Sequence, residues 1–115
     1  MDCIFCKIIE GSIPCEKVYE NENILAFRDI HPAAPVHVLI IPKKHIETMN
    51  DVTAEDMYLV GEIHKSAQQI AKEVNIADSG YRLINNCGAQ GGQVVYHLHY
   101  HLLGGTKLGY LVGGG

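Results

Sequence analysis

His97-Leu98-His99-Tyr100-His101-Leu102-Leu103 is a stretch in which histidine alternates with apolar or aromatic residues. Alternation with a period of two is typical of a β-strand, because successive side chains point to opposite faces of the sheet. We therefore expect a strand over residues 94–103. It would place the three histidines on one face and the intervening side chains on the other.

The segments before this run predict the rest of a sheet. Val36–Ile41 is a β-branched stretch ended by Pro42, which is typical of a buried strand in the middle of a sheet. Tyr81–Asn85 predicts a further strand, which a glycine-containing loop joins to the histidine strand. Glu16–Glu20 and Ile24–Asp29 are separated by a polar triplet, so we expect them to form a hairpin.

Two helices complete the pattern. Cys3–Glu10 predicts a short helix. Apolar residues recur at three- and four-residue steps from Met57 to Val74 and predict one long helix, which begins behind Thr53-Ala54-Glu55-Asp56, a stretch that resembles a capping box. Gly61 weakens this long helix, so we expect another backbone to approach closely there. Short links favour a single α+β domain over residues 1–115, with a five-stranded antiparallel meander sheet and a frayed tail at Gly113–Gly115.

The composition excludes several classes of function. The formal net charge is −4, from 9 basic and 13 acidic residues, so the chain lacks the basic surface that grips a nucleic-acid polymer. No segment has the roughly 20 apolar residues that span a bilayer, and the N-terminus has no basic start before an apolar stretch. We expect a cytoplasmic protein whose reduced cysteines bind metal or are buried, namely Cys3, Cys6, Cys15 and Cys87.

The three histidines indicate chemistry on phosphorus. Neutral imidazole is a good nucleophile near pH 7, and its protonated form donates hydrogen bonds to phosphoryl oxygens. Neighbours on one strand face stand about 6.5 to 7 Å apart, so His97 and His101 could flank a group bound at His99. The loop glycines at positions 88, 91 and 92 would let backbone N–H groups approach an anion. The alternatives are a three-histidine zinc site, a solvated strand and a plain hairpin loop.

The run 97–103 matches the His-x-His-x-His-x-x signature, with apolar x, that names the histidine triad superfamily. Further segments in order along the chain resemble the Hint branch of that superfamily, namely Cys3–Ile9, Ala26–Ile30, His37–His45, Gly91–Gln93 and Leu103–Gly105. The resemblance implies a homodimer that binds purine nucleoside monophosphates such as AMP or GMP and cleaves nucleoside phosphoramidates or related adenylates. It also makes a dinucleoside-polyphosphate hydrolase the weaker alternative.

The resemblance gives each histidine a separate role. His99 attacks the α-phosphorus to form a nucleotidyl-histidine, the protonated amine leaves, and water releases the nucleoside monophosphate. His101 contacts the phosphate, and His37 supports the triad through hydrogen bonds. The implied nucleotide-binding residues are Phe5, Ile8, Phe27, Asp29, Ile30, Asn86, Gly92, Gln93, Val94, His99 and His101.

Two of these positions carry particular expectations. Asp29 would hydrogen-bond the ribose hydroxyls, although a carboxylate here could instead cap a turn, and the apolar residues could be ordinary core. Val94 departs from the branch, which often has a side chain there that hydrogen-bonds near the leaving group. Valine has no such group, so the resemblance leaves the proton donor to the leaving group unassigned.

Cys3 and Cys6 form a CxxC pair with no strand before it, unlike a redox motif. One CxxC supplies half of a four-ligand zinc site, and several histidine triad relatives complete it at positions that correspond to His45 and His97. The resemblance therefore implies a structural Zn²⁺ on Cys3, Cys6, His45 and His97, with reduced core cysteines as the alternative. His97 would then orient the strand, and no catalytic cofactor would be required.

Three functions compete at this point. The leading one is a phosphoramidase with a histidine nucleophile. The second is a metal-dependent hydrolase that uses the His97, His99 and His101 cluster, which chelation would inactivate, unlike a histidine nucleophile. The third is a nucleotide-binding regulatory protein with incidental hydrolysis, whose biological role would survive replacement of His99.

Overall fold

The computed structural model describes residues 3–110, so the predicted tail at Gly113–Gly115 lies outside the described residues. Its strands form one antiparallel sheet in the order β1-β2-β3-β5-β4. None of the described helices is long and apolar enough to cross a membrane. The elements are α1 (Ile4–Ile9), β1 (Lys17–Glu20), β2 (Ile24–Arg28), β3 (Val36–Pro42), 3₁₀ turns at Met49–Asp51 and Ala54–Asp56, α2 (Met57–Glu73), β4 (Tyr81–Asn85) and β5 (Tyr100–Gly104).

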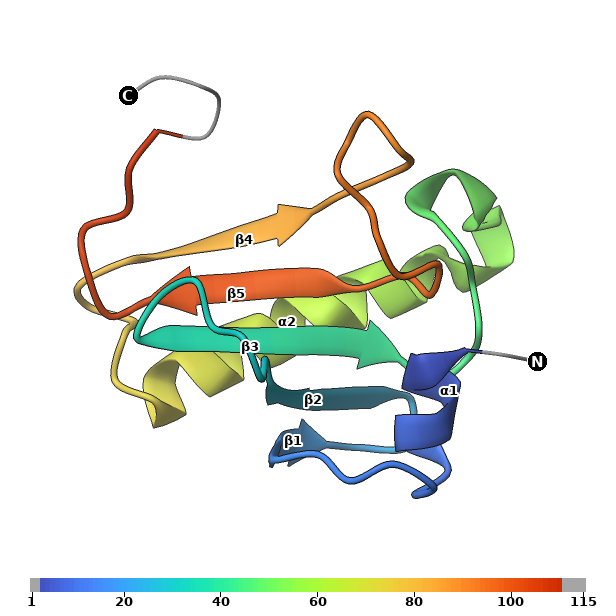
Figure 1. Cartoon of the computed structure of the whole chain (residues 1–115), viewed down its shortest axis with the longest axis horizontal. Helices are drawn as coiled ribbons and strands as arrows, with labels where there is room; N and C mark the ends of the chain where they lie inside the picture. Colours follow the sequence, from blue (N-terminus) through green and yellow to red (C-terminus); the bar gives the residue numbers. More distant parts are fainter. Residues whose placement is uncertain (1–2, 111–115) are drawn as a thin grey trace.

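This sheet confirms the predicted α+β class, but only its first half is a simple meander. Strands β1, β2 and β3 are neighbours in sequence order. After β3 the chain crosses one face of the sheet through α2 and enters β4 at the far edge, so β5 returns between β3 and β4 (Figure 1). His101 on β5 consequently lies opposite Leu39 of β3 and Ile84 of β4. The third triad histidine is therefore held by strands on both sides.

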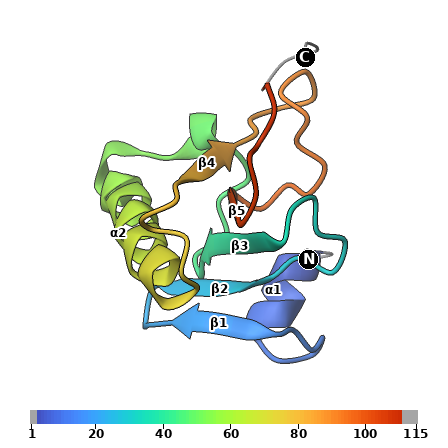
Figure 2. The same cartoon turned by 90° about the vertical axis from the view of Figure 1, so that its left-hand side faces the viewer.

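The two faces of the sheet have different coverings. Helix α2 packs on one face, whereas α1 and the β4–β5 loop lie on the other (Figures 1 and 2). Ile63 and Ile70 of α2 are fully buried in one cluster with Ile40 of β3 and Leu102 of β5. A smaller buried cluster joins α1 to β2 and β3 and contains Cys3, Phe5, Leu25, Phe27, Leu39 and Ile41. Because both faces are covered, β3 is buried along almost its whole length and is apolar except for His37, as predicted for a central strand.

The histidine strand is shorter than the sequence pattern predicts. Strand β5 begins at Tyr100 rather than at residue 94. Just before it, the N–H of Leu98 donates to the carbonyl of Ile46 at 2.6 Å, so this stretch is bonded to the segment after β3. The predicted alternation still holds through the extended approach, because the residues between the histidines are buried in the α2-side cluster. The histidines lie on the other face of the sheet.

One predicted detail of the long helix is wrong. Thr53 makes no side-chain capping hydrogen bond, and the capping box lies earlier, where Thr48 and Asp51 cap the 3₁₀ turn Met49–Asp51. A β-carbon placed on Gly61 would meet no atom within 4 Å among the described residues, so the close approach predicted there is not made by the described part of this chain and stays a prediction for a partner. Apolar spacing predicted the helix correctly, because burial along one face stabilises it without the predicted cap.

Candidate nucleotide-binding site

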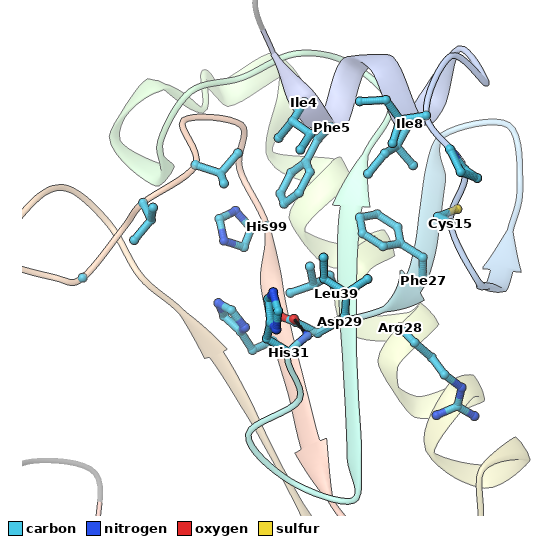
Figure 3. Close-up of a pocket in the computed structure, with 17 residues that line it drawn as sticks. Ile4, Phe5, Ile8, Cys15, Phe27, Arg28, Asp29, His31, Leu39 and His99 are labelled. Carbon is cyan, nitrogen blue, oxygen red and sulfur yellow. Dashed lines mark hydrogen bonds between the residues drawn. The ribbon is translucent and has the colours of Figure 1, made fainter.

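An open cavity of about 450 Å³ lies on the sheet face opposite α2. Its lining comes from α1, the end of β2, β3, the β4–β5 loop and β5, and its volume is in the range of small-molecule sites (Figure 3). Of the predicted nucleotide-binding residues, the lining contains Phe5, Ile8, Phe27, Asp29, Ile30, Gly92, Val94, His99 and His101. Asn86 and Gln93 lie outside it.

One part of the cavity is an apolar slot. Phe5 and Ile8 project toward it from α1, and Phe27 faces them from β2 (Figure 3). The rings of Phe5 and Phe27 meet edge to face with centroids 5.6 Å apart. Aromatic and branched walls of this kind favour a flat ring, such as a nucleobase, by stacking and by removing apolar surface from water. At the mouth, Ile30 and Val94 leave 85% and 87% of their surface exposed, which a bound ligand would partly cover.

The hydrogen bonds of His99 determine which of its nitrogens is free. Its Nδ1 lies 2.7 Å from the carbonyl oxygen of His97, and because a carbonyl only accepts, Nδ1 carries the proton and donates it. Burial lowers the pKa of His99 below the ordinary value of histidine, which favours the neutral ring. A neutral His99 with a proton on Nδ1 has its lone pair on Nε2. This is the tautomer that a nucleophile requires.

His37 and His101 form a chain of hydrogen bonds behind the cavity. The N–H of Ala33 donates to Nδ1 of His37 at 3.0 Å, so neutral His37 carries its proton on Nε2. That Nε2 lies 2.9 Å from Nδ1 of His101, which therefore accepts, and neutral His101 carries its proton on its own Nε2. Burial, together with the neighbouring His99 and His37, lowers the pKa of His101 to about 4. His101 can thus present a hydrogen-bond donor to a ligand in the cavity that it lines.

Asp29 caps its own turn and also lines the cavity, where the sequence predicts a bond to the ribose. Its Oδ1 accepts from the N–H of His31 at 2.8 Å, which is the local turn-capping bond. Its Oδ2 lies 3.5 Å from Nε2 of His37, and the residue lines the cavity, as Figure 3 shows. The carboxylate is therefore held in place by its own turn while it faces the cavity.

Gln93 holds the glycine loop together from inside. It is buried, its Oε1 accepts from the N–H of Gly88 at 2.9 Å, and its Nε2 donates to the carbonyls of Glu47 and Val95. Asn86 similarly donates to the carbonyl of Gly91 at 2.7 Å. Because these amides bond to the backbone, they shape the loop and leave the cavity lining to their neighbours Gly92 and Val94.

A second cluster, separate from the cavity, brings together the four predicted metal ligands: Cys3, Cys6, His45 and His97. Nδ1 of His97 lies 3.2 Å from Nδ1 of His45 and 3.3 Å from Sγ of Cys3. Sγ of Cys6 lies 3.3 Å from Nδ1 of His45. Zinc bond lengths with tetrahedral angles would separate two nitrogen ligands by about 3.3 Å and a nitrogen and a sulfur ligand by about 3.6 Å. The donor set and its spacing therefore fit a tetrahedral metal ion.

The position of His97 argues against a three-histidine metal site. Its Nε2 donates to the carbonyl of Pro42 at 2.8 Å, so its lone pair is on Nδ1, among the cysteines. His97 does not line the cavity, whereas His99 and His101 do. The run of three histidines is thus divided between two sites, and the alternative with all three on one metal is not formed.

Several lining residues were not identified from the sequence. They are Ile4, Ile13, Pro14, Cys15, Arg28, His31, Leu39 and Val95. Ile13, Pro14 and Cys15 come from the connection after α1, whose path no sequence pattern indicates. Arg28 and His31 lie within two residues of Asp29 in the sequence, and this proximity is the only sequence feature that indicates a place in the cavity lining. Figure 3 shows Arg28 directed away from the other lining side chains, and its guanidinium pairs with Glu16.

Fold and site together define a class of small α+β proteins in which alternating histidines lead into an apolar nucleotide-sized cavity. A family model described as the scavenger mRNA decapping enzyme C-terminal binding region matches residues 2–109. A HIT-like protein of Chlamydia pneumoniae is 55% identical over 92% of this chain and 96% of its own length. The purine nucleoside phosphoramidase of Escherichia coli is 51% identical over 94% of this chain and 91% of its own length.

Solved structures agree with these relatives. A histidine triad protein from Clostridium difficile superposes with a TM-score of 0.94 at 51% identity, covering 97% of both chains. A HIT family hydrolase from Legionella pneumophila gives a TM-score of 0.92 at 51% identity, covering 95% of this chain and 97% of its own. The chain belongs to the histidine triad (HIT) family.

Proposed function

We propose that this protein is a purine nucleoside phosphoramidase, which hydrolyses the P–N bond of nucleoside 5′-phosphoramidates or related adenylates through a nucleotidyl intermediate on His99. The observation that supports it best is the 2.7 Å bond from Nδ1 of His99 to the His97 carbonyl, which leaves the Nε2 lone pair of a cavity-lining histidine available. The name of the Escherichia coli relative supports the choice of the P–N bond.

The reaction follows from the positions of the side chains. The base enters the apolar slot, where Phe5 and Phe27 form part of the wall, and the ribose hydroxyls donate to Asp29. Nε2 of His99 attacks phosphorus, a bond from Nε2 to phosphorus forms, and the P–N bond to the amine breaks as the amine takes a proton from solvent. His101 donates from Nε2 to a phosphoryl oxygen. Water then attacks phosphorus and returns a proton to solvent, the bond to His99 breaks, and the nucleoside monophosphate leaves.

A rapid-quench experiment tests the intermediate directly. Wild-type protein mixed with adenosine 5′-phosphoramidate and quenched within one turnover by a denaturant at basic pH, where a P–N bond to histidine survives, should show one adenylyl group, which fragmentation in the mass spectrometer locates on His99. A His31→Ala variant is a suitable comparison, since His31 lines the cavity but stands outside the hydrogen-bond chain of the triad. An adduct on another residue would contradict the assignment of His99.

We also propose that Cys3, Cys6, His45 and His97 hold a structural Zn²⁺. The spacing of their four donor atoms supports this ligand set. Zinc with four protein ligands would stabilise the junction of α1 with the histidine segment, and the hydrolytic steps above need no catalytic cofactor. The homodimer that the family resemblance implies is likewise a proposal, which sedimentation equilibrium would test.

Gly91 gives a prediction about the glycine loop, which contains Gly88, Gly91 and Gly92 and would approach the phosphate. A β-carbon there would lie 2.4 Å from the carbonyl oxygen and 3.0 Å from the nitrogen of Cys87, both backbone atoms. Because the loop must shift to relieve this clash, Gly91→Ala should weaken AMP binding by at least about tenfold, or about 1.4 kcal/mol. Calorimetric titration measures the effect. Gly61→Ala is the matched control, because its methyl group meets open space and should leave AMP affinity unchanged. Equal affinity in both variants would show that the loop does not hold the phosphate.

Val94 gives a prediction about the leaving group. Valine offers no hydrogen bond, and its side chain is 87% exposed at the mouth of the cavity. Val94→Ser would place a hydroxyl there, which can stabilise a departing amine by about 1 kcal/mol and raise kcat by about fivefold for poor leaving groups. Val94→Ala controls for the loss of apolar surface. Measurement of kcat for substrates whose leaving amines differ in basicity, in wild type and both variants, checks this prediction. If Val94→Ser changed kcat by the same factor for every amine, the prediction would be wrong.

A further inference from the structure

The proposed metal cluster and the nucleotide cavity share helix α1. The residues between the two cysteines are Ile4 and Phe5, and both line the cavity. Cys3 is the N-cap of α1, and its Sγ accepts from the N–H of Cys6 at 3.2 Å. The helix has only 6 residues, so it is far below the length at which a helix is stable by itself. The conformation of this wall of the cavity therefore depends on tertiary contacts, which are the packing of Phe5 in the smaller buried cluster and the contacts of the two cysteines with the histidines.

His97 is a second connection between the two sites. Its ring turns Nδ1 to the cysteines and Nε2 to the Pro42 carbonyl, while its own backbone carbonyl accepts from Nδ1 of His99. The ring of Phe5 packs edge-on against both histidines, with centroids 5.9 Å from His97 and 5.1 Å from His99. A movement of His97 would thus shift the acceptor that sets the tautomer of His99 and the aromatic wall beside it.

We propose that Cys3, Cys6 and His45 are positioning residues for the nucleotide site, so that a metal ion on the cluster and a nucleotide in the cavity bind cooperatively. The metal-bound cluster fixes the Phe5 wall and the His97 carbonyl before the nucleotide arrives. Without metal, the nucleotide must order these groups itself and binds more weakly. This coupling rests on the proposed nucleotide site but goes beyond a purely stabilising metal.

Cooperative binding is reciprocal, which makes the proposal quantitative. If the metal tightens nucleotide binding by some factor, the nucleotide must tighten metal binding by the same factor. We expect a factor of about ten, within the usual range of coupling between two sites. If the zinc ion only stabilised the fold and had no effect on the cavity, nucleotide affinity would be the same with and without metal, and the coupling factor would be one.

The experiment uses the full chain stripped of metal and titrated with Co²⁺, whose thiolate absorption bands report occupancy of the cluster. Co²⁺ affinity is measured with and without saturating AMP, and AMP affinity is measured by calorimetry with and without Co²⁺. Cys87→Ser, which removes a thiol outside the cluster, should retain both affinities and the coupling. Phe5→Leu should retain Co²⁺ binding and lower the coupling factor by several fold, because it removes the ring that packs against both histidines and leaves the His97 carbonyl in place.

A spectroscopic readout separates positioning from stability. The ¹⁵N chemical shifts of the His99 ring should show the Nδ1-protonated tautomer in the Zn²⁺ form, and a mixture of tautomers after the metal is removed. AMP binding that is independent of metal would overturn the coupling and leave the proposed hydrolase intact. A cluster that takes up no Co²⁺ would overturn both the coupling and the proposed metal site, again without affecting the proposed hydrolase. A failure of AMP to bind in either form would contradict the proposed function, and the coupling with it.

Discussion

His99→Ala is expected to lower kcat for adenosine 5′-phosphoramidate by at least about 10⁴-fold, because removal of a nucleophile abolishes the covalent route. AMP affinity should change by less than about threefold, since the base slot and Asp29 remain in place and the lost imidazole has its largest effect in the transition state. Steady-state kinetics and calorimetric titration measure the two quantities. A large loss of kcat with unchanged AMP binding would identify a reacting group rather than a binding one.

Two controls accompany this result. His64→Ala removes a histidine that packs against Tyr100 from α2, on the far side of the sheet, and should leave kcat within about twofold. Treatment of wild-type protein with a chelator, followed by measurement of kcat at saturating substrate and well below the melting temperature of the metal-free protein, tests the metal-dependent alternative. Loss of a structural metal ion would weaken substrate binding but retain most of kcat, whereas loss of a metal-activated water would abolish turnover. If His99→Ala kept more than a tenth of wild-type kcat, the nucleotidyl-histidine route would be wrong.

The sequence predicted the fold where one face of each element had a distinct pattern. The β-branched run at 36–41 and the strand at 81–85 were located well, because burial on a pleated or fully covered surface dictates residue type. Strand order was harder, since β5 enters between β3 and β4 only after α2 has carried the chain to the far edge. Local pattern does not encode that crossing, which depends on how α2 packs across the sheet.

The site was predictable through its motif but not through its geometry. Alternation placed His97, His99 and His101 on one face, yet it could not show that they serve two sites. That division depends on Cys3, Cys6 and His45, which are distant in sequence and meet His97 only in the folded chain. Gln93 was expected to touch the nucleotide, but its amide is occupied by three backbone groups that a sequence pattern does not reveal.

The double variant Cys3→Ser, Cys6→Ser is expected to lose stoichiometric zinc and to melt about 15 °C below the wild type. A ligand present at about 1,000 times its Kd stabilises the folded state by about 4 kcal/mol, and each kcal/mol shifts Tm by about 4 °C in a domain of this size. The loss should be large because α1 is short and its cysteines belong to the cluster that joins it to His97. Metal analysis and calorimetric melting of protein purified without added zinc measure both effects.

The matched control is Cys87→Ser, in which the replaced thiol lies in the glycine loop and outside the cluster. It should keep one zinc per chain and melt within about 2 °C of the wild type, as surface-loop substitutions usually do. Addition of a strong chelator to the wild type should reproduce the melting temperature of the double variant, since both remove the same ion from the same ligands. If wild-type protein purified without added zinc carried no metal, or if the double variant melted at the wild-type temperature, Cys3 and Cys6 would be ordinary thiols, one buried and one partly buried, that pack in the cluster of Phe5.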